Sequence, residues 1–205
     1  TSRVTGSRDR GSGYLPGVRN TIAVASGKGG VGKSTVAANL AVALRQAGAT
    51  VGLMDADVYG PSIPKLMGAS DVQQFTENGK VIPPSRHGVK IMSMGFFLPK
   101  NEAVIWRGPM LHKMIQEFLG RVEWGELDYL ISDMPPGTGD AQLTLAQQVA
   151  VDGVVIVTTP QDVATVDSRK SVKFVEMLGF RVLGIIENMS GMVCRHCRQE
   201  IDLFG

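Results

Sequence analysis

The sequence predicts an α/β fold of three layers, in which helices cover both faces of a doubly wound, mostly parallel sheet. Three observations support this class. Short apolar runs typical of buried strands alternate with longer stretches of helical periodicity along the 205 residues. A glycine-rich loop joins the first apolar run to the first helical stretch. Acidic residues follow other apolar runs, and the carboxyl ends of parallel strands are where doubly wound sheets bind ligands.

Composition fits one folded domain, because 205 residues with 43% hydrophobic content can bury a sizeable core. Residues 1–14, rich in Ser, Gly and Arg, are expected to form a flexible arm. Residues 15–205 are expected to form the domain, with an incomplete C-terminal end. The net charge of +2 gives no compositional reason to expect nucleic acid. No apolar run approaches the roughly 20 residues needed to span a bilayer, and no secretory signal is visible. We therefore expect no membrane partner and a cytoplasmic location, with an organelle interior left open.

The elements follow the chain in a regular order. Predicted strands cover residues 21–25, 50–54, 89–97, 128–133, 151–158 and 180–187. Predicted helices cover residues 36–46, 110–119, 140–149 and 167–178, and Gly48 and Gly179 are expected to stop the first and the last of them. Between the second and third strands, Asn78 and Gly79 indicate a hairpin.

The glycine-rich loop at residues 27–35 reads GKGGVGKST and fits the phosphate-binding pattern, with a strand before it and a helix after it. Glycines let several backbone N–H groups converge on one centre, next to the positive end of the following helix. Lys33 would reach the β- and γ-phosphates of a bound nucleotide, and the Ser34 hydroxyl would bind magnesium. The predicted phosphate-binding residues are Gly27, Lys28, Gly29, Gly30, Val31, Gly32, Lys33, Ser34 and Thr35. The alternative is a glycine-rich turn that binds nothing.

Carboxylates follow two of the predicted strands. Asp55 and Asp57 come directly after residues 50–54, beside the phosphate loop if the sheet is parallel. Asp133 ends the strand at 128–133 and would hold magnesium through water, as a Walker B carboxylate does. The loop that follows Asp133 resembles a switch that responds to the γ-phosphate. The alternatives are an aspartate-rich turn that caps the next helix and a purely structural Asp133.

Cys194 and Cys197 form a C-x-x-C pair beyond the last predicted strand. This spacing places two thiolates on one side of a tight loop, where they can share a metal centre. Two ligands complete neither a tetrahedral zinc site nor a four-cysteine cluster, and the chain has no other cysteine. The ligand count closes if two chains each contribute one pair. A thioredoxin-like redox pair and a zinc clamp, with His196 as a candidate ligand, remain open.

Lys28 makes the phosphate loop resemble the deviant Walker A loop of the MinD/ParA-like ATPases, a SIMIBI-type class of P-loop NTPases. Several further segments resemble the Mrp/ApbC-type iron–sulfur carrier ATPases, namely LPGV at 15–18, DADVYGPS at 55–62, WRGP at 106–109, DMPPGTGD at 133–140, TPQD at 159–162, and ENMS at 187–190 with the cysteine pair. The resemblance covers nearly all of the chain from residue 15.

This resemblance implies an ATPase that forms a homodimer around two nucleotides. Lys28 would contact the partner subunit's nucleotide, Asp57 would orient the attacking water, and Lys28, Lys33 and Asp57 would be the catalytic set. Asp55 would support the magnesium shell formed with Ser34 and Asp133. Asn188 would contact the adenine base, the alternative being a strand-end cap.

The resemblance also implies a cargo. A labile 4Fe–4S cluster would bridge two subunits through Cys194 and Cys197 of each and would pass to apo iron–sulfur proteins, supported by slow ATP hydrolysis. Three other functions remain open: a MinD/ParA-type positioning ATPase, a zinc or nickel metallochaperone of the same fold, and a reductase relative. In a reductase relative the cluster cysteines are expected on separate loops.

Overall fold

The computed structural model describes residues 15–57, 60–71, 75–77, 79–96, 116, 119–137, 142, 149 and 151–201. The expected arm at 1–14, the WRGP motif at 106–109, loop residues 138–140 and most of the helices expected at 110–119 and 140–149 lie outside the described residues. Among those described, no helix is long and apolar enough to cross a membrane.

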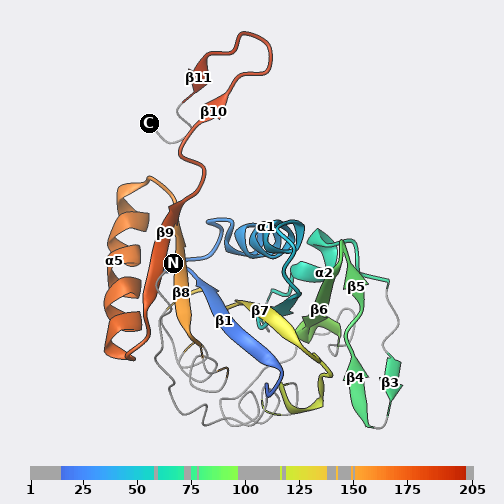
Figure 1. Ribbon diagram of the computed structural model, residues 1–205. Coiled ribbons are helices and arrows are strands. Elements are labelled where there is room, and N and C mark those ends of the chain that lie inside the picture. Colours follow the sequence, from blue (N-terminus) through green and yellow to red (C-terminus); the bar gives the residue numbers. More distant parts are fainter. Residues whose placement is uncertain are drawn as a thin grey trace.

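Seven strands of the described residues form one sheet in the order β5-β6-β2-β7-β1-β8-β9 (Figure 1). Every neighbouring pair is parallel except β5 and β6. The bounds are β1 Val18–Ala25, β2 Val51–Asp55, β5 Ser85–Arg86, β6 Val89–Ser93, β7 Leu127–Asp133, β8 Gly153–Thr158 and β9 Val182–Glu187. All six predicted strands are therefore present, and β5 adds a short antiparallel edge strand.

Helices lie on both faces of the sheet, as the sequence predicts. Helix α1 (Lys33–Gln46) connects β1 to β2, whereas α5 (Asp162–Met177) connects β8 to β9 on the other side of β1. Right-handed crossovers that run in opposite directions along a sheet place their helices on opposite faces. The buried side chains divide accordingly: Ala37 and Ala41 of α1 belong to one apolar cluster, and Val175 of α5 belongs to another. The fold is the three-layer, doubly wound class.

Both long helices end at a glycine. Gly48 has φ +95°, its N–H donates to the Arg45 carbonyl, and the N–H of Ala49 donates to the Leu44 carbonyl. These two bonds form a Schellman motif, which satisfies carbonyls that the last turn leaves free. Gly179, with φ +73°, ends α5 with the same pair of bonds. The predicted stops at Gly48 and Gly179 are confirmed.

Two predicted boundaries are wrong. The strand expected at 89–97 ends at Ser93 and continues as a 3-10 turn over Met94–Phe96, because the Ser93 hydroxyl accepts the N–H of Gly95 and turns the chain out of the ladder. The helix expected at 167–178 begins five residues earlier, at Asp162. Asp162 places a carboxylate in the first turn, which stabilises the N-terminus of the helix. The spacing of the apolar residues alone did not predict this earlier start.

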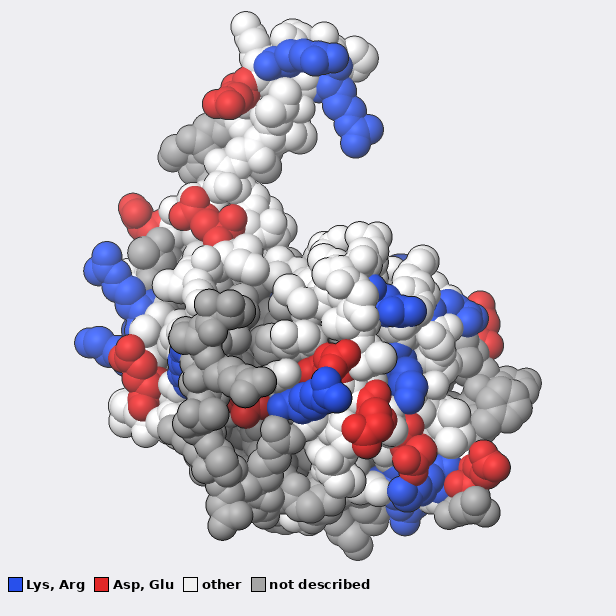
Figure 2. Space-filling model, viewed as in Figure 1, with Lys and Arg blue, Asp and Glu red and all other residues white. Residues whose placement is uncertain are grey.

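A hairpin and a short helix complete the described body, whose charged side chains are mixed in sign. The Asn-Gly signal is confirmed as a hairpin between β3 (Phe75–Glu77) and β4 (Lys80–Ile82). The short helix α2 (Ile63–Leu66) follows β2. Lys, Arg, Asp and Glu side chains are intermixed over the face drawn in Figure 2, with no large area of one sign among the described residues.

The cysteine pair lies on a third small element that the sequence did not predict as strands. β10 (Met192–Val193) and β11 (Glu200–Ile201) pair antiparallel. Figure 1 shows this hairpin extending away from the sheet beyond the end of β9. The two thiols are therefore held on an arm rather than inside the body.

Candidate functional site

The candidate site forms at the carboxyl edge of the parallel sheet. In the ladder between β2 and β7, Asp55 lies opposite Asp133, and in the ladder between β1 and β7, Val24 lies opposite Asp133. The phosphate loop leaves β1 directly after this row and enters α1. Strand register therefore brings together Val24, Asp55 and Asp133, which lie far apart in the sequence.

The loop backbone bends at two glycines. Gly30 has φ +81° and Gly32 has φ +84°, a region that residues with a Cβ rarely adopt. The Gly32 carbonyl accepts the N–H of Val36, which begins α1. The loop thus ends where the unpaired N–H groups of the first helical turn can bind an anion.

An open cavity of about 720 Å³ lies over the loop. Seven of the predicted site residues line it, namely Gly29, Gly30, Gly32, Lys33, Ser34, Thr35 and Asp57. Another part of the wall comes from residues that follow β2, namely Gly60, Lys65 and Leu66. Met189, which follows β9, also lines the cavity. A polyphosphate with its counter-ion has room in this cavity, whose wall carries both the lysine and the hydroxyl expected for it.

Lys33 and Asp133 form an ion pair at the base of the loop. Lys33 Nζ lies 2.5 Å from Asp133 Oδ1, and the two side chains are 7% and 0% exposed. Burial raises the pKa of Asp133 above its ordinary value, and the Lys33 ammonium works in the opposite direction. The other carboxylate oxygen, Oδ2, is buried and receives no hydrogen bond of normal geometry, and the nearby Ser34 hydroxyl acts with Lys33 to lower the pKa of the carboxyl. Buried carboxylate oxygens are normally satisfied, so this atom fits a water in a magnesium shell.

Asp55 lies beside Asp133, fully buried. Its carboxylate accepts the Ser93 hydroxyl at 2.9 Å and the backbone N–H groups of Ile63 and Asp57 at 3.1 and 3.2 Å. Burial, followed by the charge of Asp133, raises the pKa of Asp55 to about 7, against the effect of these hydrogen bonds. Asp55 therefore holds the backbone at Asp57 and Ile63, and its predicted support of a magnesium shell remains a prediction.

Asp57 is buried at the wall of the cavity, and its Oδ1 accepts the backbone N–H of Gly60 at 3.1 Å. The bond holds the carboxylate at the turn that follows β2. This location is compatible with the predicted contact to the attacking water, which remains a prediction.

Asn188 connects the end of β9 to the phosphate loop. Its Nδ2 donates to the Val31 carbonyl at 2.9 Å, and its backbone N–H donates to the Thr158 carbonyl at 2.8 Å. A Cβ on Gly32 would stand 2.3 Å from this Nδ2. Asn188 thus ties the loop to β8 and β9, and the predicted contact with adenine remains a prediction.

The Lys28 side chain donates from Nζ to Gln161 Oε1 at 3.0 Å. Gln161 precedes α5 and lies 133 residues away in sequence. The residues that line the phosphate cavity include Gly29 and Gly30 but not Lys28. Gly27 and Val31 do not line the cavity either. The structure therefore directs the Lys28 ammonium away from the predicted phosphate contacts that line the cavity and toward the turn between β8 and α5.

Cys194 and Cys197 are free thiols at the tip of the hairpin. The backbone of Cys194 makes two hydrogen bonds across the turn. Its N–H donates to the Gln199 carbonyl, and its carbonyl accepts the N–H of Arg198. The backbone N–H groups of Cys197 and His196 lower the pKa of the Cys194 thiol below its ordinary value. A thiol that ionises more readily is a better metal ligand.

Sequence reasoning missed three contributors to the site. Ser93 ends β6, so the rule that strand ends gather at one edge could have found it. Gln161 lies in the TPQD segment but received no role, and its contact depends on two loops far apart in sequence. Met189, with φ +59°, lines the cavity directly after Asn188; it belongs to the ENMS segment, in which only Asn188 was given a role.

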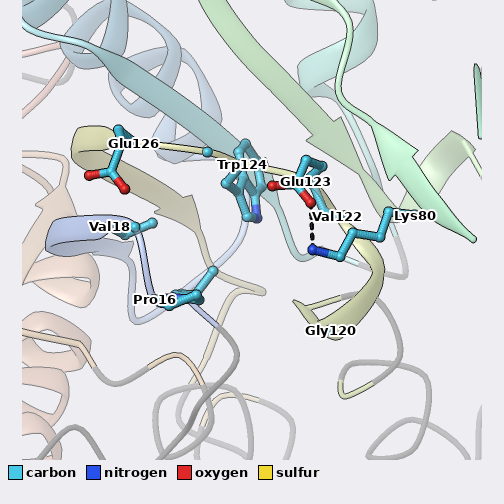
Figure 3. A pocket seen from close by; sticks show the side chains of 11 residues that line it. Pro16, Val18, Lys80, Gly120, Val122, Glu123, Trp124 and Glu126 are labelled. Carbon is cyan, nitrogen blue, oxygen red and sulfur yellow. Dashed lines mark hydrogen bonds and ion pairs between the residues drawn. The ribbon is translucent and has the colours of Figure 1, made fainter. Parts of the chain in front are cut away.

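A second cavity, of about 460 Å³, lies at the opposite edge of the sheet, where β1 and β7 begin (Figure 3). Leu15, Val18 and Trp124 line it, and Lys80 and Glu123 pair at 2.5 Å on its rim. The indole nitrogen of Trp124 is buried without a partner. None of the predicted site residues lines this cavity.

A phosphate loop at the carboxyl edge of a doubly wound parallel sheet, with a lysine and a carboxylate paired beneath it, defines a P-loop NTPase fold of the MinD/ParA type. A family model of the ParA group, described as NUBPL iron-transfer P-loop NTPase, matches residues 17–205. The chain belongs to this family.

Relatives and solved structures agree with this assignment. The chain is 55% identical over 196 residues to an iron–sulfur cluster carrier protein of Aquifex aeolicus and 49% identical over 191 residues to one of Methanocaldococcus jannaschii. These matches cover 93% and 92% of this chain but 53% and 66% of the relatives, so the chain spans about half the length of the Aquifex protein.

Among solved structures, a nucleotide-binding protein of Archaeoglobus fulgidus in complex with ADP is similar at 45% identity with a TM-score of 0.82, over 94% of this chain and 75% of that one. The septum site-determining protein MinD of Pyrococcus horikoshii, complexed with Mg-ADP, is similar at 25% identity with a TM-score of 0.62, over 90% of this chain and 73% of that one.

Proposed function

We propose that this chain is the ATP-binding and ATP-hydrolysing part of an iron–sulfur cluster carrier. The observation that carries this proposal is a phosphate-loop site joined, through Asn188, to a projecting hairpin with two free thiols. The names of the relatives, which are iron–sulfur cluster carrier proteins, and the ADP bound to the Archaeoglobus protein support it.

For the nucleotide, the residues present fit ATP with magnesium. The loop glycines and Lys33 would hold the phosphates, while Ser34 and Asp133 would hold magnesium, with Asp55 behind them. The unpartnered Oδ2 of Asp133 supports this assignment, because a buried carboxylate oxygen without a partner is an available acceptor for a water bound to magnesium. Magnesium would neutralise charge on the phosphates, and Asp57 would orient the water that attacks the terminal phosphate.

The Lys33–Asp133 pair supplies a reason for magnesium and phosphate to enter together. In the nucleotide-free chain, the Lys33 ammonium is engaged by Asp133. A phosphate would draw the ammonium away, and Asp133 would then require another cation to balance its buried charge. Magnesium near Asp133 would meet this requirement.

For the cargo, one chain offers too few ligands. The sequence has two cysteines, and no group of three or more His, Cys, Asp or Glu among the described residues could hold a metal ion. A 4Fe–4S cluster takes four thiolates, so two copies would each contribute Cys194 and Cys197. Because the hairpin stands away from the body, the tips of two copies can approach without moving the sheet. The cluster would then pass to apo iron–sulfur proteins.

We also propose that the chain works as one of two paired subunits in a reducing compartment. Two subunits would pair around ATP, with residues 15–205 acting as one ATPase domain and residues 1–14 as an arm. The thiols must stay reduced to receive iron and sulfide, which suits the cytoplasm or an organelle matrix.

The test is anaerobic reconstitution of the chain with ferrous iron and sulfide, followed by measurement of bound iron, absorption spectrum and mass in solution. We expect about four irons per pair of chains. The Cys194→Ser and Cys197→Ser variants should each bind little iron and remain monomeric. The control Arg195→Ala, in the same turn, should bind as much iron as wild type. Equal iron in the cysteine variants would refute the cluster site. Bound zinc or nickel without iron, from protein purified without oxygen, would favour a metallochaperone.

A further inference from the structure

Lys28 is held by a residue to which sequence analysis assigned no role. Its Nζ donates to Gln161 Oε1 at 3.0 Å, and Lys28 is absent from the residues that line its own phosphate cavity. The ammonium is thus directed at the turn before α5 rather than at the phosphates that its own loop would bind.

The backbone around Lys28 is fixed, so only its side chain can readily change partner. The Ser26 hydroxyl donates to the Lys28 carbonyl at 2.9 Å. Gly27 lies against α5, since a Cβ there would stand 2.7 Å from the Asp167 carbonyl oxygen. The close approach of Gly27 to α5 leaves the loop no room to shift toward this helix, and the Ser26 hydrogen bond holds the backbone at Lys28 within the loop.

We propose that Gln161 is the positioning residue of Lys28. It keeps the ammonium outside the phosphate cavity of its own subunit and available to the triphosphate of a second copy of this chain. This inference rests on the proposed function, in which Lys28 neutralises charge on the partner's nucleotide. A side-chain amide suits the task because it is a neutral acceptor, and a charged phosphate oxygen binds an ammonium more strongly. A carboxylate at the same place would compete with the phosphate.

The first test measures the contact itself in nucleotide-free protein. Lysines are acetylated with limiting acetic anhydride, and the extent at each lysine is read by mass spectrometry. Gln161→Glu should slow acetylation of Lys28, because a carboxylate stabilises the protonated amine, and Gln161→Ala should accelerate it. We expect changes of about three- to tenfold in opposite directions. Lys65, which lines the cavity on α2, serves as the internal control and should not change. An unchanged Lys28 in both variants would overturn the inference.

The second test asks whether Gln161 acts through Lys28. ATP hydrolysis is measured for wild type, Gln161→Glu, Lys28→Ala and the double variant. Gln161→Glu should lower kcat about tenfold with little change in the KM for ATP, and raised salt should relieve part of the loss. In the Lys28→Ala background the same substitution should have no further effect. Additive losses in the double variant would show that Gln161 acts by another route and would overturn the inference.

The two tests separate the inference from the proposed function. If wild type hydrolyses no ATP under any condition, the proposed function fails, and the acetylation experiment alone decides for or against Gln161. If wild type hydrolyses ATP and Lys28→Ala is equally active, the proposed function survives but the inference fails.

Discussion

Gly32 illustrates how one residue shapes the phosphate loop. Its φ of +84° lies in the left-handed region, and a Cβ there would stand 2.3 Å from Asn188 Nδ2. Gly29, three residues earlier, has no atom within 4 Å of the same position and no positive φ. The two glycines share a loop and a predicted role but meet different steric demands.

Gly32→Ala should therefore destabilise the nucleotide-free chain by about 1–3 kcal/mol, because the backbone strain and the collision with Asn188 add together. Gly29→Ala should change the free energy of unfolding by less than about 0.5 kcal/mol. Urea unfolding of both variants measures the difference. Equal stability of the two would contradict the steric role of Gly32.

Asp55 makes the stability of the metal-free and nucleotide-free chain depend on pH. Burial raises its pKa in the folded chain to about 7, from 3.8 in the unfolded chain. Between these values the folded state binds more protons than the unfolded state, so the free energy of unfolding falls as the pH rises from 4 to 7. The fall is on the order of 4 kcal/mol at most.

Asp55→Asn should remove this part of the pH dependence. Urea unfolding is measured at pH 5, 6, 7 and 8, without magnesium or nucleotide. The gap, meaning the free energy of unfolding of the variant minus that of wild type, should increase as the pH rises. Asp128→Asn is the control, because hydrogen bonds from Thr50 lower the pKa of Asp128 and its titration lies below this range. Its gap to wild type should stay constant from pH 5 to 8. A constant gap for Asp55→Asn would refute the shifted pKa.

At the scale of elements, two strands of similar apolar character have different environments. β2 is buried along its whole length, whereas β9 exposes Leu183, Ile185 and Ile186. β2 lies between β6 and β7, while β9 pairs only with β8 among the described strands. Position in the sheet, rather than composition, decides how much of a strand is covered.

The hairpin that follows β9 gives Cys194 its chemical character. The N–H groups of Cys197 and His196 reach its thiol only when the turn is formed. The pH midpoint for alkylation of Cys194 by iodoacetamide should therefore be lower in the folded chain than in denaturant, since the thiolate is the reactive form. Mass spectrometry of the alkylated peptide measures this midpoint in wild type. The measurement is repeated in a Cys197→Ser variant, in which only Cys194 can be labelled. The same midpoint in both states of wild type would show that the turn does not influence the thiol.

At the scale of the whole molecule, nucleotide and magnesium should stabilise the fold by binding at the carboxyl ends of the neighbouring strands β2, β7 and β1. At a hundred times the Kd, a ligand adds about 2.7 kcal/mol to the free energy of unfolding. For a chain of this size this corresponds to a rise in Tm of about 5–10 °C.

Thermal unfolding with and without magnesium and ATP tests this expectation. Lys33→Ala should show almost no rise, because the ammonium that binds phosphate is missing. Lys170→Ala, which removes an exposed partner of Asp167 in α5, should show the full rise. A full rise in Lys33→Ala would place the nucleotide elsewhere.

Local signals in the sequence predicted the sheet class, the phosphate loop and the helix stops, because each depends on neighbouring residues. The glycine pattern of the loop, the apolar run of β2 and the glycine after α1 each occupy a few consecutive positions. Boundaries set by a single side chain, such as the hydroxyl of Ser93 that ends β6, were not predicted.

The sequence by itself determined which residues are candidates to bind phosphate and metal, since side-chain chemistry and short spacing depend only on the chain. The tertiary structure decided which of them meet: Lys33 with Asp133 across 100 residues, Lys28 with Gln161 across 133, and Asn188 with Val31 across 157. These pairs depend on strand order and crossover hand, which local periodicity does not encode.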